Sequence, residues 1–276
     1  MRPAPSAAAE ESPAVPQPRP TAAAFFDLDN TFIRGASLFH LARGFAAHHF
    51  VSSREMARFA YDQLTFRMRG EREGQVSSTR ERALAFAAGH TASELQELCV
   101  HIYDDYIAEK IWPGTCALAD LHRRRGEPVW LVTAAPIELA EVVAKRLGLD
   151  GALGTRAEAV DGKFTGKLIG DILHGPAKGD AVRNLAECKG YDLTTCHAYS
   201  DSANDLPMLT IVGHPHAVNP DHRLRERAEA EGWPVTDYRT GVRLLRAGLP
   251  GAALTGAATG AVAAGVALAK RARAKS

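Results

Sequence analysis

The sequence is poor in cysteine, and its four cysteines are not spaced as metal ligands or as a disulfide framework. They stand at positions 99, 116, 188 and 196, and no two of them form a CxxC motif. This spacing argues against a structural zinc site and against a small fold held together by disulfides. We therefore expect a protein of a reducing compartment, the cytoplasm.

The chain also lacks an excess of charge of either sign. Its 276 residues include 33 basic and 32 acidic side chains, which leaves a formal net charge of +1. A protein that binds nucleic acid or another polyanion usually carries a basic surplus. We therefore expect no nucleic acid partner, and any charge that matters for function must be local.

Long apolar runs are scarce, and the two ends of the chain differ in this respect. Residues 1–20 are rich in proline and alanine and lack the apolar run of a signal peptide, so we expect a disordered leader. Residues 247–276 form an Ala/Gly-rich tail that is uncharged up to residue 269 and ends in a basic cluster. The uncharged part is long enough to cross a membrane, but its composition is weakly apolar. Two interpretations stay open: membrane contact through residues 247–269, or a flexible tail.

Helical periodicity dominates residues 35–110. Apolar side chains recur at intervals of three and four residues over 38–45 and again over 95–106, which is the spacing of one face of an α-helix. Thr91 and Glu94 stand three residues apart just before the second stripe, as the two members of a capping box do. The sequence therefore predicts an all-helical insert over 35–110.

On either side of this insert the pattern is that of an α/β protein. The expected elements are strands at 22–26, 128–132 and 196–199 and helices at 138–147 and 178–189. Alternating strands and helices imply right-handed crossovers and a doubly wound parallel sheet. We expect this α/β core to consist of residues 21–34 and 111–246.

Side chains with oxygen ligands follow the expected strands. They are Asp27 and Asp29 after the first strand, Thr133 after the second, and Asp201, Asn204 and Asp205 after the third. Ligands of parallel α/β sheets bind at these carboxyl ends. Lys178 stands at the start of a helix, where backbone N–H groups and the helix dipole favour an anion. Carboxylates without histidine or cysteine suit Mg²⁺ rather than zinc, and phosphate is the natural anion.

The two aspartates of the first strand end predict a division of roles. If the four aspartates converge, they carry more negative charge than Mg²⁺ and Lys178 neutralise, so the pKa of one carboxyl rises. A carboxylic acid that is neutral near pH 7 can act as a general acid. We assign Asp27 as a nucleophile that forms an aspartyl-phosphate, and Asp29 as the acid and then the base. Residues two apart on an extended segment point the same way, which places both over one site.

These motifs together resemble a known family. The DLDNT run at 27–31, Thr133, Lys178 and the SDSANDLP run at 200–207 resemble the four motifs of the haloacid dehalogenase (HAD) superfamily, in their usual order. The helical insert is similar to the cap of the phosphoserine phosphatase-like branch. The resemblance spans roughly residues 22–220. It implies a Rossmann-like core with a helical cap, and Mg²⁺-dependent hydrolysis of a phosphate monoester.

The resemblance also implies a role for each matching residue. The implied metal ligands are Asp27 and Asp201 through their side chains and Asp29 through its backbone carbonyl, with Asp205 supporting the metal shell or Lys178. The implied substrate-binding residues are Thr133, Lys178 and Asn204, which would hold the phosphoryl oxygens.

The chain departs from serine-specific phosphatases in ways that leave the substrate open. Ala36 stands where those enzymes carry a glutamate for the substrate's amino group, and the second motif reads VTAA rather than Ser-Gly-Gly. We expect a small phosphorylated metabolite as substrate, with phosphoserine as the alternative. A membrane-bound tail would favour a phospholipid precursor. A non-catalytic phosphate-dependent regulator is a further alternative. The complete set of Asp27, Asp29, Lys178 and Asp201 disfavours it, because a binding module needs no nucleophile beside an acid.

Two other features are expected to be structural. The eleven histidines are scattered along the sequence, and His214 and His216 lie near no second set of ligands, so surface or core roles are expected. The glycine-rich stretch 161–166 lacks the GxxxxGK[ST] pattern and fits a β-hairpin rather than a phosphate-binding loop.

Overall fold

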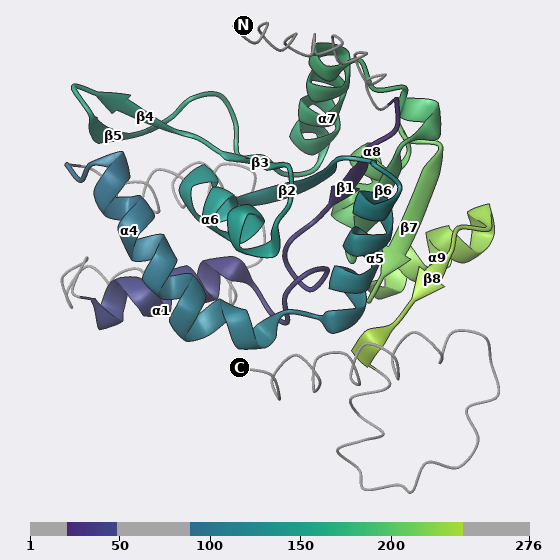
Figure 1. The fold of residues 1–276 in the computed structure, drawn as a ribbon, viewed down its shortest axis with the longest axis horizontal. Coiled ribbons are helices and arrows are strands. Elements are labelled where there is room, and N and C mark those ends of the chain that lie inside the picture. The colour runs from purple at the N-terminus through teal and green to yellow at the C-terminus, as the bar shows by residue number, and fades with distance from the viewer. Residues whose placement is uncertain (1–20, 49–88, 240–276) are drawn as a thin grey trace, which may run out of the picture.

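The computed structural model describes residues 21–48 and 89–239 (Figure 1). Three sequence-based predictions lie wholly or partly outside these residues: the leader over 1–20, the middle of the insert over 49–88, and the tail over 247–276. None of the helices in the described part is long and apolar enough to span a membrane. The strands and helices that carry the predicted motifs all lie in the two described segments.

A six-stranded parallel sheet with the order β3-β2-β1-β6-β7-β8 forms the centre of the fold. Its strands are β1 (Ala24–Phe26), β2 (Val129–Pro136), β3 (Gly151–Thr155), β6 (His197–Ser200), β7 (His214–Val218) and β8 (Val235–Thr236). From β1 the chain continues to β2 and β3 on one side and then crosses to β6, β7 and β8 on the other. This change of direction is a topological switch point, where α/β proteins bind ligands. The predicted doubly wound fold is confirmed.

The central strand β1 is buried on both faces, and all three of its residues are inaccessible to solvent. Phe26 pairs with Leu131 on β2 and with Tyr199 on β6, and it belongs to the hydrophobic core on one face of the sheet. Phe25 belongs to the core on the other face. A strand that is buried on both faces is apolar at every position, and polar residues therefore begin only at Asp27.

Helices cover both faces of the sheet (Figure 1). They are α1 (Ser37–Ala47), α4 (Ala92–Ile102), α5 (Pro113–Arg124), α6 (Ile137–Leu147), α7 (Pro176–Lys189), α8 (Leu206–Leu209) and α9 (His222–Glu231). Side chains of α1, α4, α5 and α6 join the core on the Phe26 face, and side chains of α7, α8 and α9 join the core on the Phe25 face. The helices predicted at 138–147 and 178–189 are confirmed as α6 and α7.

The described part of the insert is helical, as the periodicity predicts. α1 and α4 pack against each other, and α4 is followed by a π-helical turn (Tyr103–Ile107) and a short 3-10 turn (Ala108–Lys110). The predicted capping box is confirmed: the Glu94 N–H donates to Thr91 Oγ1 at 3.2 Å, and the Thr91 N–H donates to Glu94 Oε2 at 2.7 Å. The boundaries of the insert at 35 and 110 stay a prediction.

Replacing Thr91 with alanine is expected to lower the free energy of unfolding by about 1 kcal/mol, because a backbone N–H at the start of α4 loses its acceptor. Urea denaturation followed by far-UV circular dichroism measures this change. Thr91→Ser is the matched control, since it keeps the hydroxyl oxygen and should stay close to wild type. Equal losses in the two variants would mean that the methyl group, not the cap, matters.

A β-hairpin lies beside the start of α4 (Figure 1). β4 (Ala157–Val160) and β5 (Lys163–Leu168) are antiparallel, and Asp161 and Gly162 form the turn with φ of 51° and 78°. This confirms the hairpin predicted from the 161–166 stretch. The Phe164 N–H donates to the His90 carbonyl and the Gly89 N–H donates to the Phe164 carbonyl, both at 2.9 Å. The hairpin therefore lies against the start of α4, a contact that the sequence alone did not indicate.

The four cysteines are free thiols that differ in exposure: Cys99 and Cys196 are buried, Cys116 is partly buried and Cys188 is exposed. Burial raises the pKa of Cys99 to about 12 and that of Cys116 to about 11, and it also raises the pKa of Cys196. Brief treatment of the native protein with iodoacetamide at pH 8 is therefore expected to alkylate Cys188 alone, since the thiolate is the nucleophile. Peptide mass mapping checks the site. Cys188→Ser should remove the label, and fast labelling of Cys99 would contradict its burial.

Histidines gather at the amino ends of β6 and β7, which corrects the expectation that His214 and His216 lie near no second set of ligands. His197 begins β6 and His214 begins β7, and the parallel register places them side by side. His216 pairs with Tyr199, and their ring centroids are 4.5 Å apart. Burial lowers the pKa of His197 and of His216 to about 4, so both imidazoles are neutral at pH 7.

Candidate active site

A buried lysine joins two of the predicted aspartates at the carboxyl ends of β1 and β6. Lys178 Nζ donates to Asp27 Oδ1 at 2.5 Å and to Asp205 Oδ2 at 2.8 Å. Asp205 Oδ2 also accepts a hydrogen bond from Ser200 Oγ at 2.7 Å. All four side chains are nearly inaccessible to solvent. We call this group, Asp27, Lys178, Ser200 and Asp205, the lysine cluster.

The turn before α7 brings Lys178 to this point. Gly175 has φ of 55° and ψ of −123°, a conformation that is costly for any residue with a Cβ. Pro176 occupies the first helical position, where its missing N–H costs nothing. Lys178 follows within the first turn of α7, and its side chain enters the space between the ends of β1 and β6. Gly175, Pro176 and Lys178 together therefore place the positive charge of the lysine at this point of the site.

Asp29 lies in the loop after β1 and contacts the helical insert rather than the lysine cluster. Its Oδ1 accepts a hydrogen bond from the backbone N–H of Ser37, the first residue of α1, at 2.7 Å. Asn30, with φ of 55°, turns the loop, and its Oδ1 accepts from the Gly35 N–H at 3.1 Å. The loop between β1 and α1 is therefore closed on itself, with Asp29 attached to the start of the helix.

Asp201 follows β6 directly and is partly buried. Its side chain is hydrogen-bonded to Asn30, and its backbone carbonyl accepts from the Asp221 N–H at 2.7 Å. Asn30 thus connects the loop after β1 with the loop after β6, which keeps Asp29 and Asp201 at the same edge of the sheet.

Burial raises the pKa of three of the predicted carboxyl groups. For Asp27, Lys178 opposes this effect, while the neighbouring carboxylates Asp205, Asp29 and Asp201 add to it. Burial also raises the pKa of Asp29, although hydrogen bonds from Ser37 act in the other direction, and it raises the pKa of Asp201 to about 7. Burial acts to lower the pKa of Lys178, but Asp27 and Asp205 together raise it. The lysine is therefore charged, and its partners are the carboxyl groups of Asp27 and Asp205.

The donor set fits a hard divalent cation such as Mg²⁺. If the four carboxyl groups are ionised, their negative charge exceeds the positive charge of Lys178, and such an excess in a buried region is unfavourable unless a cation balances it. The predicted ligands are all oxygen donors, which Mg²⁺ prefers. Among the described residues, no three of these carboxylates have their oxygens within 4.8 Å of one another. This spacing is compatible with Mg²⁺, because that ion keeps several water ligands and uses one or two carboxylates.

Thr133 and Asn204 lie at the same edge of the sheet without joining the lysine cluster. Thr133, on β2, is 1% exposed, and its Oγ1 accepts a hydrogen bond from the Ala135 N–H at 3.1 Å. Asn204 is exposed, and its backbone N–H donates to Ser202 Oγ at 3.2 Å. Among the described residues, the side chain of Asn204 makes no hydrogen bond to the cluster. Within the described part of the chain, the structure thus leaves the side chains of Thr133 and Asn204 outside the hydrogen bonds of the lysine cluster.

Two residues of the site were not singled out from the sequence. The Ser200 hydroxyl donates to Asp205, and its Oγ accepts from the Ser202 N–H. Thr31 has a fully buried hydroxyl that makes no hydrogen bond among the described residues. Thr31 lies in the motif at 27–31 and Ser200 in the motif at 200–207. Their positions in these motifs were the sequence signal that could have identified them as site residues.

The part of the sequence that contains the candidate site is similar to known proteins. The family model of the haloacid dehalogenase-like hydrolases matches residues 24–210, a range that contains every candidate residue. Phosphoserine phosphatase SerB1 of Mycobacterium tuberculosis is 50% identical over 245 residues, which are 88% of this chain and 80% of that protein.

Two solved structures are similar in fold. A protein of unknown function from Bordetella pertussis Tohama I is 29% identical, with a TM-score of 0.71 over 78% of this chain and 98% of the other. A phosphoserine phosphatase in its apo form has a TM-score of 0.55 at 19% identity, over 82% of this chain and 98% of the other. At that level of identity the second likeness concerns the fold alone.

Proposed function

We propose a reaction for this chain, which belongs to the haloacid dehalogenase-like hydrolases and is a phosphatase. In this proposal it hydrolyses a phosphate monoester through an aspartyl-phosphate on Asp27. The observation that carries the proposal is the buried contact of Lys178 with Asp27 at the end of the central strand. A lysine held there by two carboxylates orients Asp27 and supplies positive charge to an incoming phosphate.

In the proposed first step, a carboxylate oxygen of Asp27 attacks phosphorus and the bond from phosphorus to the ester oxygen breaks. Asp29, whose raised pKa favours the protonated form, gives its proton to the leaving alkoxide. In the second step Asp29 takes a proton from water, the water oxygen attacks phosphorus, and the bond to Asp27 breaks. Inorganic phosphate leaves, and both carboxyl groups return to their starting states.

The remaining site residues would bind the phosphoryl group and the metal. We assign the phosphoryl oxygens to Lys178, Thr133 and Asn204. Members of the family generally use Mg²⁺, and we propose that Asp27 and Asp201 hold it here with their side chains and Asp29 with its backbone carbonyl. Asp205 would act by holding Lys178. When bound, Mg²⁺ supplies positive charge against the phosphate and the crowded carboxylates.

We propose a small phosphorylated metabolite as the substrate. Phosphoserine is the second candidate, because the relative that is 50% identical is named a phosphoserine phosphatase. Against it stands Ala36, an exposed apolar residue at the start of α1 that cannot pair with an ammonium group. A phospholipid precursor remains a candidate if residues 247–269 contact a membrane, and otherwise we place the activity in the cytoplasm.

Phosphate release from the purified full-length chain tests the proposal. The substrates are an aryl phosphate, phosphoserine, histidinol phosphate and lysophosphatidate, the last with and without lipid vesicles, each assayed with Mg²⁺ and with chelator. We expect Mg²⁺-dependent turnover on at least one of them. Ala36→Glu is the matched variant for substrate choice and should raise kcat/KM for phosphoserine relative to the aryl phosphate. Absence of turnover from folded protein on every substrate would favour the non-catalytic regulator.

A further inference from the structure

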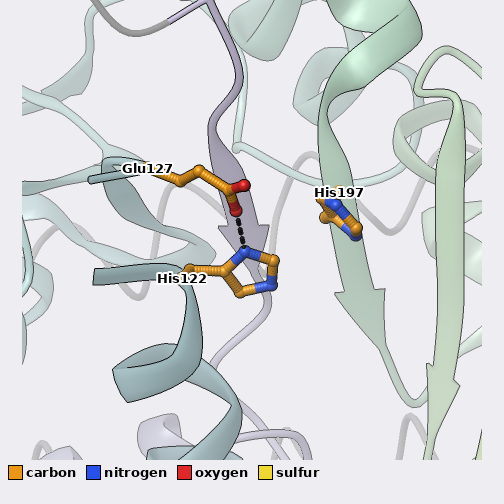
Figure 2. A group of neighbouring side chains, drawn as sticks. All are labelled: His122, Glu127 and His197. Carbon is orange, nitrogen blue, oxygen red and sulfur yellow. Dashed lines mark hydrogen bonds and ion pairs between the residues drawn. The ribbon is translucent and has the colours of Figure 1, made fainter. Parts of the chain in front are cut away.

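A second group of ligand-type side chains lies at the opposite edge of the sheet from the candidate active site. His122 is on α5 near its end, Glu127 is in the connection from α5 to β2, and His197 is the first residue of β6 (Figure 2). His214 and His216 on β7 lie beside His197. We call these five residues the histidine cluster. Because β6 and β7 begin here, the cluster is separated from the lysine cluster by the length of the strands.

Three side chains of the histidine cluster lie close enough to one another to reach a single ion. One ligand atom from each of His122, Glu127 and His197 can be chosen so that all three lie within 4.8 Å of one another. His122 Nδ1 is 2.5 Å from Glu127 Oε2, and the ring centroids of His122 and His197 are 4.6 Å apart. His197 Nδ1 is 3.2 Å from His216 Nε2. Two nitrogens bound to one tetrahedral zinc ion at about 2.0–2.1 Å are separated by about 3.3 Å.

A hydrogen-bond network by itself accounts for only part of this arrangement. His122 bridges Glu127 and the Tyr199 hydroxyl, which lies 2.7 Å from Nε2. These hydrogen bonds orient His122, while the parallel register and the hydrogen bond between His197 Nδ1 and His216 Nε2 place His197 against His214 and His216, with centroid distances of 4.6 and 5.5 Å. Three adjacent imidazoles beside a carboxylate form a set of donors that a shared cation would use.

Tyr199 supplies the outer partner that a metal-bound histidine normally has. A ligating imidazole usually hydrogen-bonds through its other ring nitrogen, which fixes the ring and its tautomer. If His122 ligates through Nδ1, its Nε2–H donates to the buried Tyr199 hydroxyl. Access is also available, since His214 is exposed and Glu127, His197 and His216 are only partly buried.

We propose that His122, Glu127 and His197, with His216 as the adjacent fourth donor, form a second metal site that takes a zinc-type transition-metal ion. Two or three imidazoles and one carboxylate suit zinc and not Mg²⁺, whose preferred ligands are oxygens. The ligands come from four places: α5, the α5–β2 connection, β6 and β7. An ion here would tie these elements together at the amino edge of the sheet, so the proposed role is stabilisation rather than catalysis.

Titration of the full-length protein with Zn²⁺ by calorimetry, in excess Mg²⁺, tests this site without relying on phosphatase activity. We expect one Zn²⁺ per chain that Mg²⁺ does not displace. Glu127→Gln and His197→Asn should each weaken Zn²⁺ binding by at least about tenfold. His222→Ala is the matched control, because His222 is 83% exposed on α9 and lies outside the cluster, and it should bind like wild type.

Two further readouts separate the histidine cluster from the aspartates. Co²⁺ in place of Zn²⁺ should give the visible absorption of a four-coordinate nitrogen and oxygen site, and Glu127→Gln should abolish it. Asp201→Asn should leave Zn²⁺ binding unchanged. Binding that is lost in Asp201→Asn, or that is unchanged in both cluster variants, would overturn the proposal and leave the histidine cluster as a hydrogen-bonded network. If His197→Asn fails to fold, the Glu127→Gln result decides.

Discussion

Replacing Asp27 with asparagine is expected to lower the turnover number on an aryl phosphate by about a thousandfold or more. The amide is close in shape to the carboxylate and can still accept a hydrogen bond from Lys178, but it cannot form the covalent intermediate. Loss of a covalent nucleophile has effects of this size or larger in other hydrolases. Steady-state phosphate release with Mg²⁺ measures the change.

Two further measurements show whether the lower turnover of Asp27→Asn comes from the missing nucleophile. The thermal unfolding midpoint of Asp27→Asn should stay near or above that of the wild type, since the substitution removes a crowded buried charge. Asp221→Asn, which changes the carboxylate that caps α9, is the control for an aspartate outside the lysine cluster, and it should keep most of the activity. If Asp27→Asn retains more than about a tenth of the wild-type turnover, Asp27 is not the nucleophile.

Replacing Lys178 with methionine is expected to lower the free energy of unfolding by about 3–5 kcal/mol, the usual cost of leaving buried charges without their partner. Lys178 is 3% exposed and is the shared donor to Asp27 and Asp205. Removing it leaves two buried carboxylates facing each other. Urea denaturation in the presence of a chelator measures the loss without a contribution from bound cation.

The pH dependence of this loss provides an internal control. Burial raises the pKa of Asp27 above its unfolded value, and Lys178 is the group that opposes the rise. Without Lys178 the pKa of Asp27 rises further, so the folded variant binds this proton at a higher pH than the folded wild type does, and acidification stabilises the variant more. The difference in unfolding free energy between Lys178→Met and wild type should therefore narrow as the pH falls from neutral. The double variant with Lys178→Met and Asp205→Asn should recover part of the lost unfolding free energy. A loss below about 1 kcal/mol in Lys178→Met would contradict the buried ion pairs of Lys178 with Asp27 and Asp205.

The candidate site was largely predictable because its residues follow strands. Parallel topology brings the carboxyl ends of strands to one edge whatever the loops between them do, so Asp27, Asp201 and Asp205 converge from distant positions in the sequence. The hydrogen-bond partner of each site side chain was less predictable from the sequence. That Asp205 holds Lys178 and that Asp29 accepts from Ser37 depend on side-chain directions, which sequence spacing does not determine.

Parts of the fold escaped prediction for identifiable reasons. β3 reads GALGT and β7 begins HPH, so neither has the β-branched or aromatic run that marks a strand. α9 is mostly polar, so its apolar stripe is weak. His122 and His197 are far apart in the sequence, and only the register of β6 and the position of α5 bring their rings together. Contacts of this kind require the three-dimensional arrangement.

The placement of β1 has a consequence for the way the protein is made. β1 is synthesised first among the strands of the described residues, yet its two neighbours in the sheet are β2 and β6, whose residues follow more than a hundred positions later. A nascent chain therefore carries the apolar AFF segment without its pairing partners until most of the protein has left the ribosome. Folding that depends on such distant pairings is slow, and the exposed segment is prone to aggregation meanwhile. Asp27 and Asp29 at its end keep the emerging segment charged during that interval.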